Sequence, residues 1–271
     1  NLGYFYAFNY RNNSIIWAKN FNIPFRSNLK INGNKIFTVD HQNNLYFLKK
    51  EDGSKLNTIP TEESKLNNNF QNNLALNNAS LYFLNTYGSL YSIDTQSGRI
   101  KWFRNINQSL DVNASNLFNG NEIVFHNEKI IASSNNHTYV FDAKNGSTLL
   151  KNNFALKIRP ILTDDILFLI TKNDFLIAID LTKNKILYSY DINKKIADYY
   201  DIKKKKAEIL NFALINNNIF IFLRNSYVLI FGNNGELQDI YKLKNKINSN
   251  PIFINNSILY LNKSNKLIIL N

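Results

Sequence analysis

Short apolar runs alternate along the chain with short polar segments, and one stretch shows the pattern most clearly. Residues 89–94 form a β-prone run, residues 94–98 are polar, and the apolar residues Ile100 and Trp102 then alternate with polar ones. Alternation over a few residues is typical of a β-strand. Gly98 can adopt the positive φ that a tight turn requires. The stretch therefore predicts a β-hairpin.

The same hairpin recurs along the chain with four anchor positions at offsets of 0, 3, 7 and 11 residues. The first anchors are Tyr6, Tyr46, Tyr91, Tyr139, Ile177, Val228 and Ile268, and the last copy is cut off by the chain end. Each third anchor present is Gly or Asn, the residues that best tolerate a left-handed backbone. The residues that we expect to shape the repeat are Trp17, Gly53, Asp94, Gly98, Trp102, Asp142, Gly146, Asp180 and Gly235.

A period of about 40 to 50 residues with several short strands in each copy indicates a β-propeller. Residues 159–192 predict one complete blade, with strands at 159–162, 166–171, 175–179 and 186–190. Applied to the whole chain, this plan predicts an all-β propeller of four-stranded antiparallel blades in one domain, residues 1–271. We expect five complete blades between a two-stranded start and a three-stranded end.

Three segments depart from the plan. Residues 116–127 predict a longer first half of one blade, as an extended strand or a bulged hairpin. Residues 60–71 and 193–208 are polar insertions, and the second carries lysines at 194–195 and 203–206. A basic segment of this kind suits a partner or an anionic lipid surface. For both insertions we favour a solvated surface loop or a short helix over a binding segment.

The composition narrows the classes of partner. The net charge is +12 and the isoelectric point is about 9.6, but the lysines are spread over many loops in a chain rich in Asn, Lys and Ile. We interpret this as a compositional bias and expect no nucleic-acid partner. Absence of Cys excludes disulfides and thiolate metal sites. The chain begins at Asn1 without an apolar leader and holds no apolar run of about 20 residues, so we expect a piece of a longer product.

A search for reactive groups gives no catalytic constellation. The spacing of His41, His126 and His137 matches no metal signature. Carboxylates recur at the second anchor, where Asp side chains accept hydrogen bonds from the backbone of a turn. The nine glycines are isolated, so no phosphate-binding loop is expected. We expect no enzyme activity, no catalytic residue, no cofactor and no metal.

The hairpin of Tyr91, Asp94, Gly98 and Trp102 resembles the PQQ-like repeat, the unit of pyrroloquinoline-quinone dehydrogenase propellers and their non-catalytic relatives. The resemblance covers nearly the whole chain. In that family a Trp at the fourth anchor docks between adjacent blades. Trp17 and Trp102 match this pattern. The remaining fourth anchors, Asn57, Leu150, Tyr188 and Asp239, do not match it, so the resemblance predicts degenerate docking here.

Within that superfamily the chain most resembles the family of the outer-membrane assembly factor BamB. Residues Phe25, Arg26 and Ser27 match the apolar–Arg–small loop with which that family grips BamA periplasmic domains, and Arg26 would be the anchor. An ordinary Arg at the start of a strand is an equally good interpretation. The family also has an acidic partner loop, for which Asp111 is the nearest candidate.

The resemblance implies a non-catalytic interaction scaffold on the periplasmic face of the outer membrane of a Gram-negative bacterium. Its partners would be BamA-like periplasmic domains and unfolded outer-membrane proteins. The protein would be a monomer within a complex, form an eight-bladed ring, and touch the membrane only through a lipid anchor outside this chain.

Two alternatives remain open. One is a PQQ-dependent dehydrogenase or a decayed relative, although the adjacent-Cys disulfide of those enzymes has no counterpart in a chain without Cys. The other is a sensor or luminal domain of a larger receptor.

Overall fold

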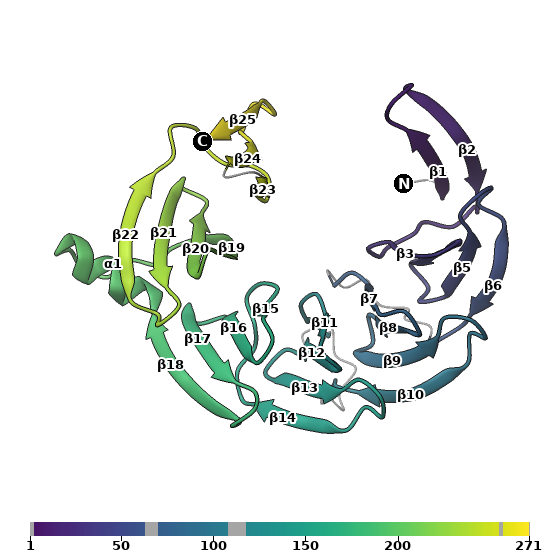
Figure 1. Ribbon diagram of the computed structural model, residues 1–271, viewed down its shortest axis with the longest axis horizontal. Coiled ribbons are helices and arrows are strands. Elements are labelled where there is room, and N and C mark those ends of the chain that lie inside the picture. Colours follow the sequence, from purple (N-terminus) through teal and green to yellow (C-terminus); the bar gives the residue numbers. More distant parts are fainter. Residues whose placement is uncertain (1–2, 63–69, 108–117, 255–256, 271) are drawn as a thin grey trace. The chain divides into compact units, whose positions relative to one another are not determined.

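The computed structural model describes residues 3–62, 70–107, 118–254 and 257–270. The chain separates into two compact units, Asn1–Leu156 and Lys157–Asn271. Within each unit consecutive strands form small antiparallel sheets that follow one another in chain order (Figure 1).

The first unit contains four sheets in its described residues. Their strands are β1 (Tyr4–Asn9) and β2 (Ser14–Asn20); β3 (Lys30–Asn32), β4 (Lys35–Val39), β5 (Leu45–Lys49) and β6 (Lys55–Ile59); β7 (Asn73–Leu76), β8 (Ser80–Leu84), β9 (Ser89–Asp94) and β10 (Ile100–Asn105); and β11 (Val124–His126), β12 (Lys129–Ser133), β13 (Thr138–Asp142) and β14 (Thr148–Asn152).

The second unit contains three sheets and helix α1 (Ile192–Tyr200) in its described residues. Their strands are β15 (Ile161–Leu162), β16 (Ile166–Ile170), β17 (Phe175–Asp180) and β18 (Lys185–Asp191); β19 (Ile209–Ile215), β20 (Asn218–Leu223), β21 (Tyr227–Gly232) and β22 (Leu237–Lys242); and β23 (Ile252–Ile254), β24 (Ser257–Leu261) and β25 (Leu267–Leu270).

The second and third strands of the blades carry most of the core. β8 is buried along its whole length, whereas in β10 only Trp102 is buried. Continuous apolar sequence is expected for a strand packed on both faces, and a mostly exposed outer strand needs a single inward side chain. The apolar clusters accordingly combine residues of neighbouring blades within one unit, as Tyr82 and Phe141 do in the first unit and Phe168 and Phe231 in the second.

Each described four-stranded sheet has a register shift between its third and fourth strands, and the two-stranded sheet has one between β1 and β2. In the third sheet Trp102 pairs with Ser92 and Ile100 pairs with Ile93, which leaves Lys101 without a partner. A β-bulge of this kind bends the strand and re-aims the next side chain. The bulge therefore directs the fourth-anchor side chain out of its own sheet.

The β-propeller fold and the arrangement of five four-stranded sheets between a two-stranded and a three-stranded one are confirmed in the described residues. Two segments differ from their expected bounds by more than one residue. The strand expected at 159–162 begins only at Ile161, after Pro160, which lacks a backbone N–H. Of the described residues 118–127, only 124–127 belong to a hairpin, as β11 and its turn to β12. The insertion at 193–208 begins as helix α1, which is one of the two structures that we favoured for it.

Helix α1 forms because its ends are capped. The Asp191 carboxylate accepts the backbone N–H of Lys194, and Asp201 adopts a left-handed conformation at the other end. Of the insertion at 60–71, residues 63–69 lie outside the described residues. A single domain over residues 1–271 and a closed eight-bladed ring stay predictions.

Candidate partner-binding rim

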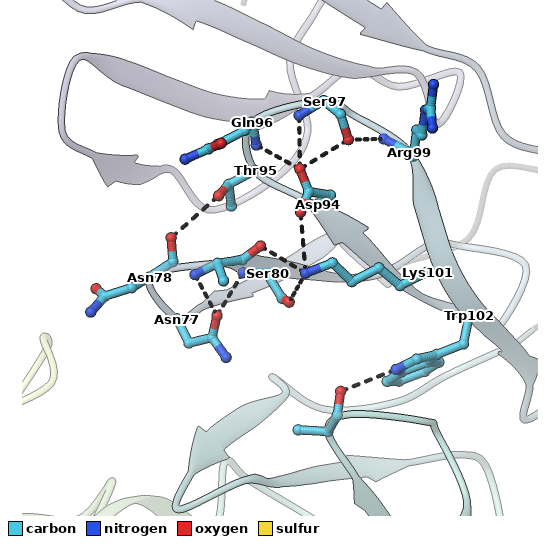
Figure 2. Close-up of polar contacts among 12 residues, drawn as sticks. Asn77, Asn78, Ser80, Asp94, Thr95, Gln96, Ser97, Arg99, Lys101 and Trp102 are labelled. Carbon is cyan, nitrogen blue, oxygen red and sulfur yellow. Dashed lines mark hydrogen bonds and ion pairs between the residues drawn. The ribbon is translucent and has the colours of Figure 1, made fainter.

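Each blade has two ends, and the turn between its third and fourth strands occupies one of them. Figure 2 shows this turn in the third sheet. The Asp94 carboxylate accepts the backbone N–H groups of Gln96 at 3.0 Å and Ser97 at 2.8 Å, and the Ser97 hydroxyl at 2.9 Å. These hydrogen bonds from Ser97 hold the pKa of Asp94 well below its usual range. The carboxylate therefore shapes the turn.

The other second-anchor aspartates occupy the same place. Asp142 accepts the backbone N–H of Lys144 at 2.8 Å. Asp180 accepts the hydroxyl and the backbone N–H of Thr182 at 2.6 and 2.9 Å. Hydrogen bonds from Thr182 and Lys183 lower the pKa of Asp180 to about 2. All three carboxylates have backbone donors in their own turns.

The fourth anchor of one blade covers the third-anchor glycine of the next. The Trp102 indole N–H donates to the Ala143 carbonyl at 3.0 Å (Figure 2), and the Trp17 indole N–H donates to the Lys50 carbonyl at 3.0 Å. A Cβ added at Gly146 would lie 2.6 Å from Trp102 Cε3, which leaves no room for any other residue there.

The expectation of degenerate docking needs correction at two positions. A Cβ at Gly98 would lie 2.7 Å from Asn57 Nδ2, and one at Gly235 would lie 2.5 Å from Tyr188 Cε2. Asn57 and Tyr188 therefore cover their glycines although neither is Trp, because the bulge aims the side chain whatever its type. Asp239 is exposed on β22 and accepts a hydrogen bond from the Tyr199 hydroxyl at 3.1 Å.

The opposite end of the blades carries the connections from one blade to the next. In the first unit these connections are joined by reciprocal hydrogen bonds. The Asn28 side chain donates to the Leu74 carbonyl at 2.9 Å and accepts the Leu74 N–H at 2.7 Å. The buried Asn72 side chain donates to the Asp40 carbonyl at 3.0 Å. We call this end, with residues 21–29, 40–44, 60–62, 70–72 and 85–88, the connection rim.

Phe25, Arg26 and Ser27 lie together on the connection rim, and all three are half-buried. The Phe25 ring makes edge contacts with Phe21 at 5.2 Å and with Tyr46 at 5.4 Å between centroids. The Ser27 hydroxyl donates to the Asn28 carbonyl at 2.7 Å and accepts the Val39 N–H at 2.9 Å. Two of these three side chains thus fix the segment to its own blade.

The backbone around Arg26 is also held by hydrogen bonds to its own blade. The Arg26 N–H donates to the Val39 carbonyl at 2.8 Å, and Phe25 forms a bridge with the buried Asp40. Asp40 accepts the backbone N–H groups of Gln42 at 2.8 Å and Asn44 at 2.9 Å. Burial, and then the charge of Asp40, raise the pKa of Tyr46 to about 12. The Arg26 side chain is therefore presented from a rigid backbone.

Glu62 is a carboxylate on the connection rim that the sequence analysis did not identify. Glu62 accepts the hydroxyl of Ser89 at 2.7 Å, the side-chain amide of Asn85 at 2.8 Å, and the hydroxyl of Tyr91. Burial opposes the charge of Glu62, but the hydrogen bonds outweigh it and lower its pKa. Glu62 follows β6 and its partners belong to the next blade, so no local pattern could have revealed the pairing.

The second unit repeats the Arg26 position with a different residue. Lys157 N–H donates to the Ile170 carbonyl at 2.8 Å, as Arg26 does to Val39. The Lys157 ammonium forms an ion pair with Asp174, whose other oxygen accepts the Asn193 side chain at 3.1 Å. At the place of Asp174, four residues beyond the end of the second strand, the first unit has Asn43.

The histidines and the remaining candidates are scattered. His41 and His137 lie in turns after second strands, and His126 ends β11. Over residues 3–62, 70–107, 118–254 and 257–270, no group of three or more His, Cys, Asp or Glu is placed to hold a metal ion. In the same part of the chain, no helix is long and apolar enough to span a bilayer. Asp111 lies outside the described residues.

Solved structures of several kinds share the fold. BamB from Moraxella catarrhalis is similar with a TM-score of 0.80 and 15% identity, over 99% of this chain and 78% of that chain. Sqt1 from Saccharomyces cerevisiae has a TM-score of 0.72 and 12% identity, over 99% and 76%. A quinohemoprotein alcohol dehydrogenase from Pseudomonas putida has a TM-score of 0.62 and 10% identity, over 85% and 44%. At these identities the likeness shows the fold alone.

Comparison by sequence is more specific. No curated protein sequence matches the chain. Residues 3–190, well over half of the chain, match the family model described as outer membrane protein assembly factor BamB. That span includes the Arg26 segment and the hairpins from Tyr6 to Tyr188. The chain belongs to the BamB family.

Proposed function

We propose that this protein is a non-catalytic scaffold that holds a protein partner on the connection rim, with Arg26 as the anchor. The family match over residues 3–190 supports a role in outer-membrane protein assembly, which is the role that the family's name states. The observation that carries the proposal is the fixed backbone of residues 25–27, from which the Arg26 side chain extends.

The segment of residues 25–27 suits recognition of a partner because its backbone is already ordered before binding. Phe25 is held by neighbouring rings and Ser27 by two hydrogen bonds, so the segment does not have to be immobilised by the partner. A planar guanidinium can donate two parallel hydrogen bonds to one carboxylate. The partner surface should therefore offer an Asp or Glu with apolar neighbours.

The family relationship supports BamA-like periplasmic domains as that partner and unfolded outer-membrane proteins as transient cargo. In this proposal the protein works as a monomer within the assembly complex at the periplasmic face of the outer membrane. A lipid anchor outside this chain would hold it there. Strand edges could receive an extended segment of cargo by adding one strand to a sheet.

The test is capture of the purified periplasmic domains of the BamA homologue from the same organism. Arg26→Glu should weaken capture by about tenfold or more, because the charge is reversed at the anchor. Arg99→Glu is the matched control, since Arg99 is exposed in the β9–β10 turn of the next blade, at the end opposite the connection rim. Equal capture by the wild type and Arg26→Glu, with unchanged unfolding curves, would remove Arg26 from the interface.

The dehydrogenase fold match raises the question of quinone chemistry. Enzymes of that kind hold a quinone beside Ca²⁺, which needs several converging oxygen ligands. In the described residues no three acidic or His side chains converge, and the sequence contains no Cys. These residues do not fit such a site, and we derive no reaction step through one.

A further inference from the structure

The second unit has a groove that the proposed function does not use. It is a cavity of about 450 Å³ between the insertion that contains α1 and the sheet β19–β22. Its inner wall is apolar, formed by Leu223, Leu229 and Ile240, which are nearly or fully buried. Ile196 and Tyr200 of α1 form the facing wall. Concave apolar sites of this size are typical of ligand-binding sites.

The groove is preformed because both ends of the insertion are tied down within the second unit. At the start, Asp191 caps α1, and the Asn193 side chain donates to Asp174 at 3.1 Å. At the end, the Ala207 N–H donates to the Asn193 side chain at 2.7 Å. In between, the Tyr199 hydroxyl donates to Asp239 of β22 at 3.1 Å. The insertion is thus held at both ends and, through Tyr199, at the outer strand of the sheet.

The mouth of the groove is cationic. Lys205 and Lys206 line it, both are exposed, and no acidic residue lines the groove. In the described part of the chain neither ammonium has an ion pair, whereas the neighbouring Lys204 pairs with Asp191. Ile202, exposed by 53%, adds an apolar side chain at the entrance.

We propose that this groove binds an acidic peptide segment that carries one large apolar side chain. The apolar side chain enters the cavity against Leu229, and flanking carboxylates meet Lys205 and Lys206. Charge complementarity selects an acidic partner, because the mouth carries two unpaired positive charges. Concavity selects a peptide over a membrane, because a protruding side chain fills a pocket that a bilayer surface only covers.

Fluorescence anisotropy tests this with a labelled, end-blocked peptide of one tryptophan between two glutamates on each side. The complete chain should bind it saturably, and more weakly in high salt. The double variant Lys205→Glu and Lys206→Glu should lose about tenfold in affinity or more. Lys244→Glu with Lys246→Glu is the matched control, since these exposed lysines lie outside the groove and carry the same charge change.

Two further measurements separate the apolar contribution to peptide binding from the electrostatic contribution. Asn225 is exposed at the groove and accepts the Tyr227 N–H at 3.4 Å, so Asn225→Trp should block entry and weaken binding, with an unfolding curve like that of the wild type as the check on the fold. A peptide with alanine in place of tryptophan should bind at least several-fold more weakly. The proposal is overturned by absence of saturable binding, by equal affinity of the alanine peptide or of both groove variants, or by binding only to vesicles of anionic phospholipid.

Discussion

Two copies of the repeat hairpin, residues 89–102 in the first unit and 175–188 in the second, cover a glycine of the following blade with different side chains. In both copies an Asp organises the turn and a bulge precedes the fourth anchor. In the first, Trp102 covers Gly146 and donates a hydrogen bond to the next blade. In the second, Tyr188 covers Gly235, and its buried hydroxyl has no hydrogen-bond partner in the described residues.

The second copy compensates with a second ring. Tyr188 and Tyr190 are stacked with centroids 5.4 Å apart, and a Cβ at Gly235 would lie 2.7 Å from Tyr190 Cε2. Lys195 of α1 lies 4.4 Å from the centroid of the Tyr190 ring. Burial, and then the neighbouring Tyr190, raise the pKa of Tyr188. The difference indicates that contact of an aromatic surface with a glycine joins the blades, and that the hydrogen bond is an addition.

The largest effect is expected when the glycine is replaced. Gly146→Ala places a methyl group 2.6 Å from Trp102 on a backbone with φ of +70°. The backbone strain of a left-handed alanine costs about 1–2 kcal/mol, and overpacking against Trp102 costs about 1–3 kcal/mol. The two costs should add and should lower the free energy of unfolding measured with urea. Gly33→Ala is the control, because its φ is +56° but no atom lies within 4 Å, so only the strain applies. Equal losses in both variants would contradict a packing role for Gly146.

A smaller effect, with opposite signs in the two hairpins, is expected when each aromatic residue becomes Phe. Trp102→Phe removes the indole donor of the Ala143 carbonyl and leaves it the longer hydrogen bond from the Tyr82 hydroxyl at 3.4 Å, so it should lower the free energy of unfolding by about 0.5–1.5 kcal/mol. Tyr188→Phe removes an unpaired buried hydroxyl and should change it by less than about 1 kcal/mol, toward higher stability. Urea unfolding measures the free energy of unfolding of both variants. A loss of stability in Tyr188→Phe as large as that in Trp102→Phe would contradict the difference between the two hairpins.

The smallest effect concerns the turn that both hairpins share. The folded pKa of Asp94 lies below its unfolded value of about 3.9, so its stabilisation is present above about pH 4 and is lost as the pH falls through the folded pKa. Asp94→Asn should therefore show a smaller fall in stability between pH 5 and pH 2.5 than the wild type. Because the turn is open to solvent, the difference should be at most about 1 kcal/mol.

The control for this measurement is Asp198→Asn, which removes one exposed carboxylate on α1, outside the turn. Urea midpoints at the two pH values give the comparison. Identical acid dependence in Asp94→Asn and the wild type would show that the carboxylate contributes no charge-dependent stability to the hairpin.

The sequence predicted the blades well because their strands are local. The bounds of β16 and β17 lie within one residue of the strands expected at 166–171 and 175–179, and the hairpin of β9 and β10 follows from the turn at 94–98. The sequence predicted strand bounds less well where a strand depends on contacts with a neighbouring blade. Residues 118–123 form no strand, and there the Ile123 N–H donates to the Asn73 side chain of the preceding blade.

The residues of the candidate site could likewise be predicted only where they are close together in the sequence. Phe25, Arg26 and Ser27 could be identified because they are contiguous and match a family loop. Glu62 could not, because its partners Asn85, Ser89 and Tyr91 lie more than 20 residues away. The groove beside α1 combines residues from 196 to 240, so only folding brings its apolar wall and its lysines together.

By itself the sequence determined the repeat, the strand pattern, the turn aspartates and the family resemblance, because each depends on residues within one hairpin and on the local preferences of Gly, Asn and Asp. Only the tertiary structure decided which side chains cover which glycines, how the connection rim is bonded, and where α1 leaves a groove. Those contacts join residues about one blade apart, and their geometry depends on how neighbouring sheets pack, which no local pattern encodes.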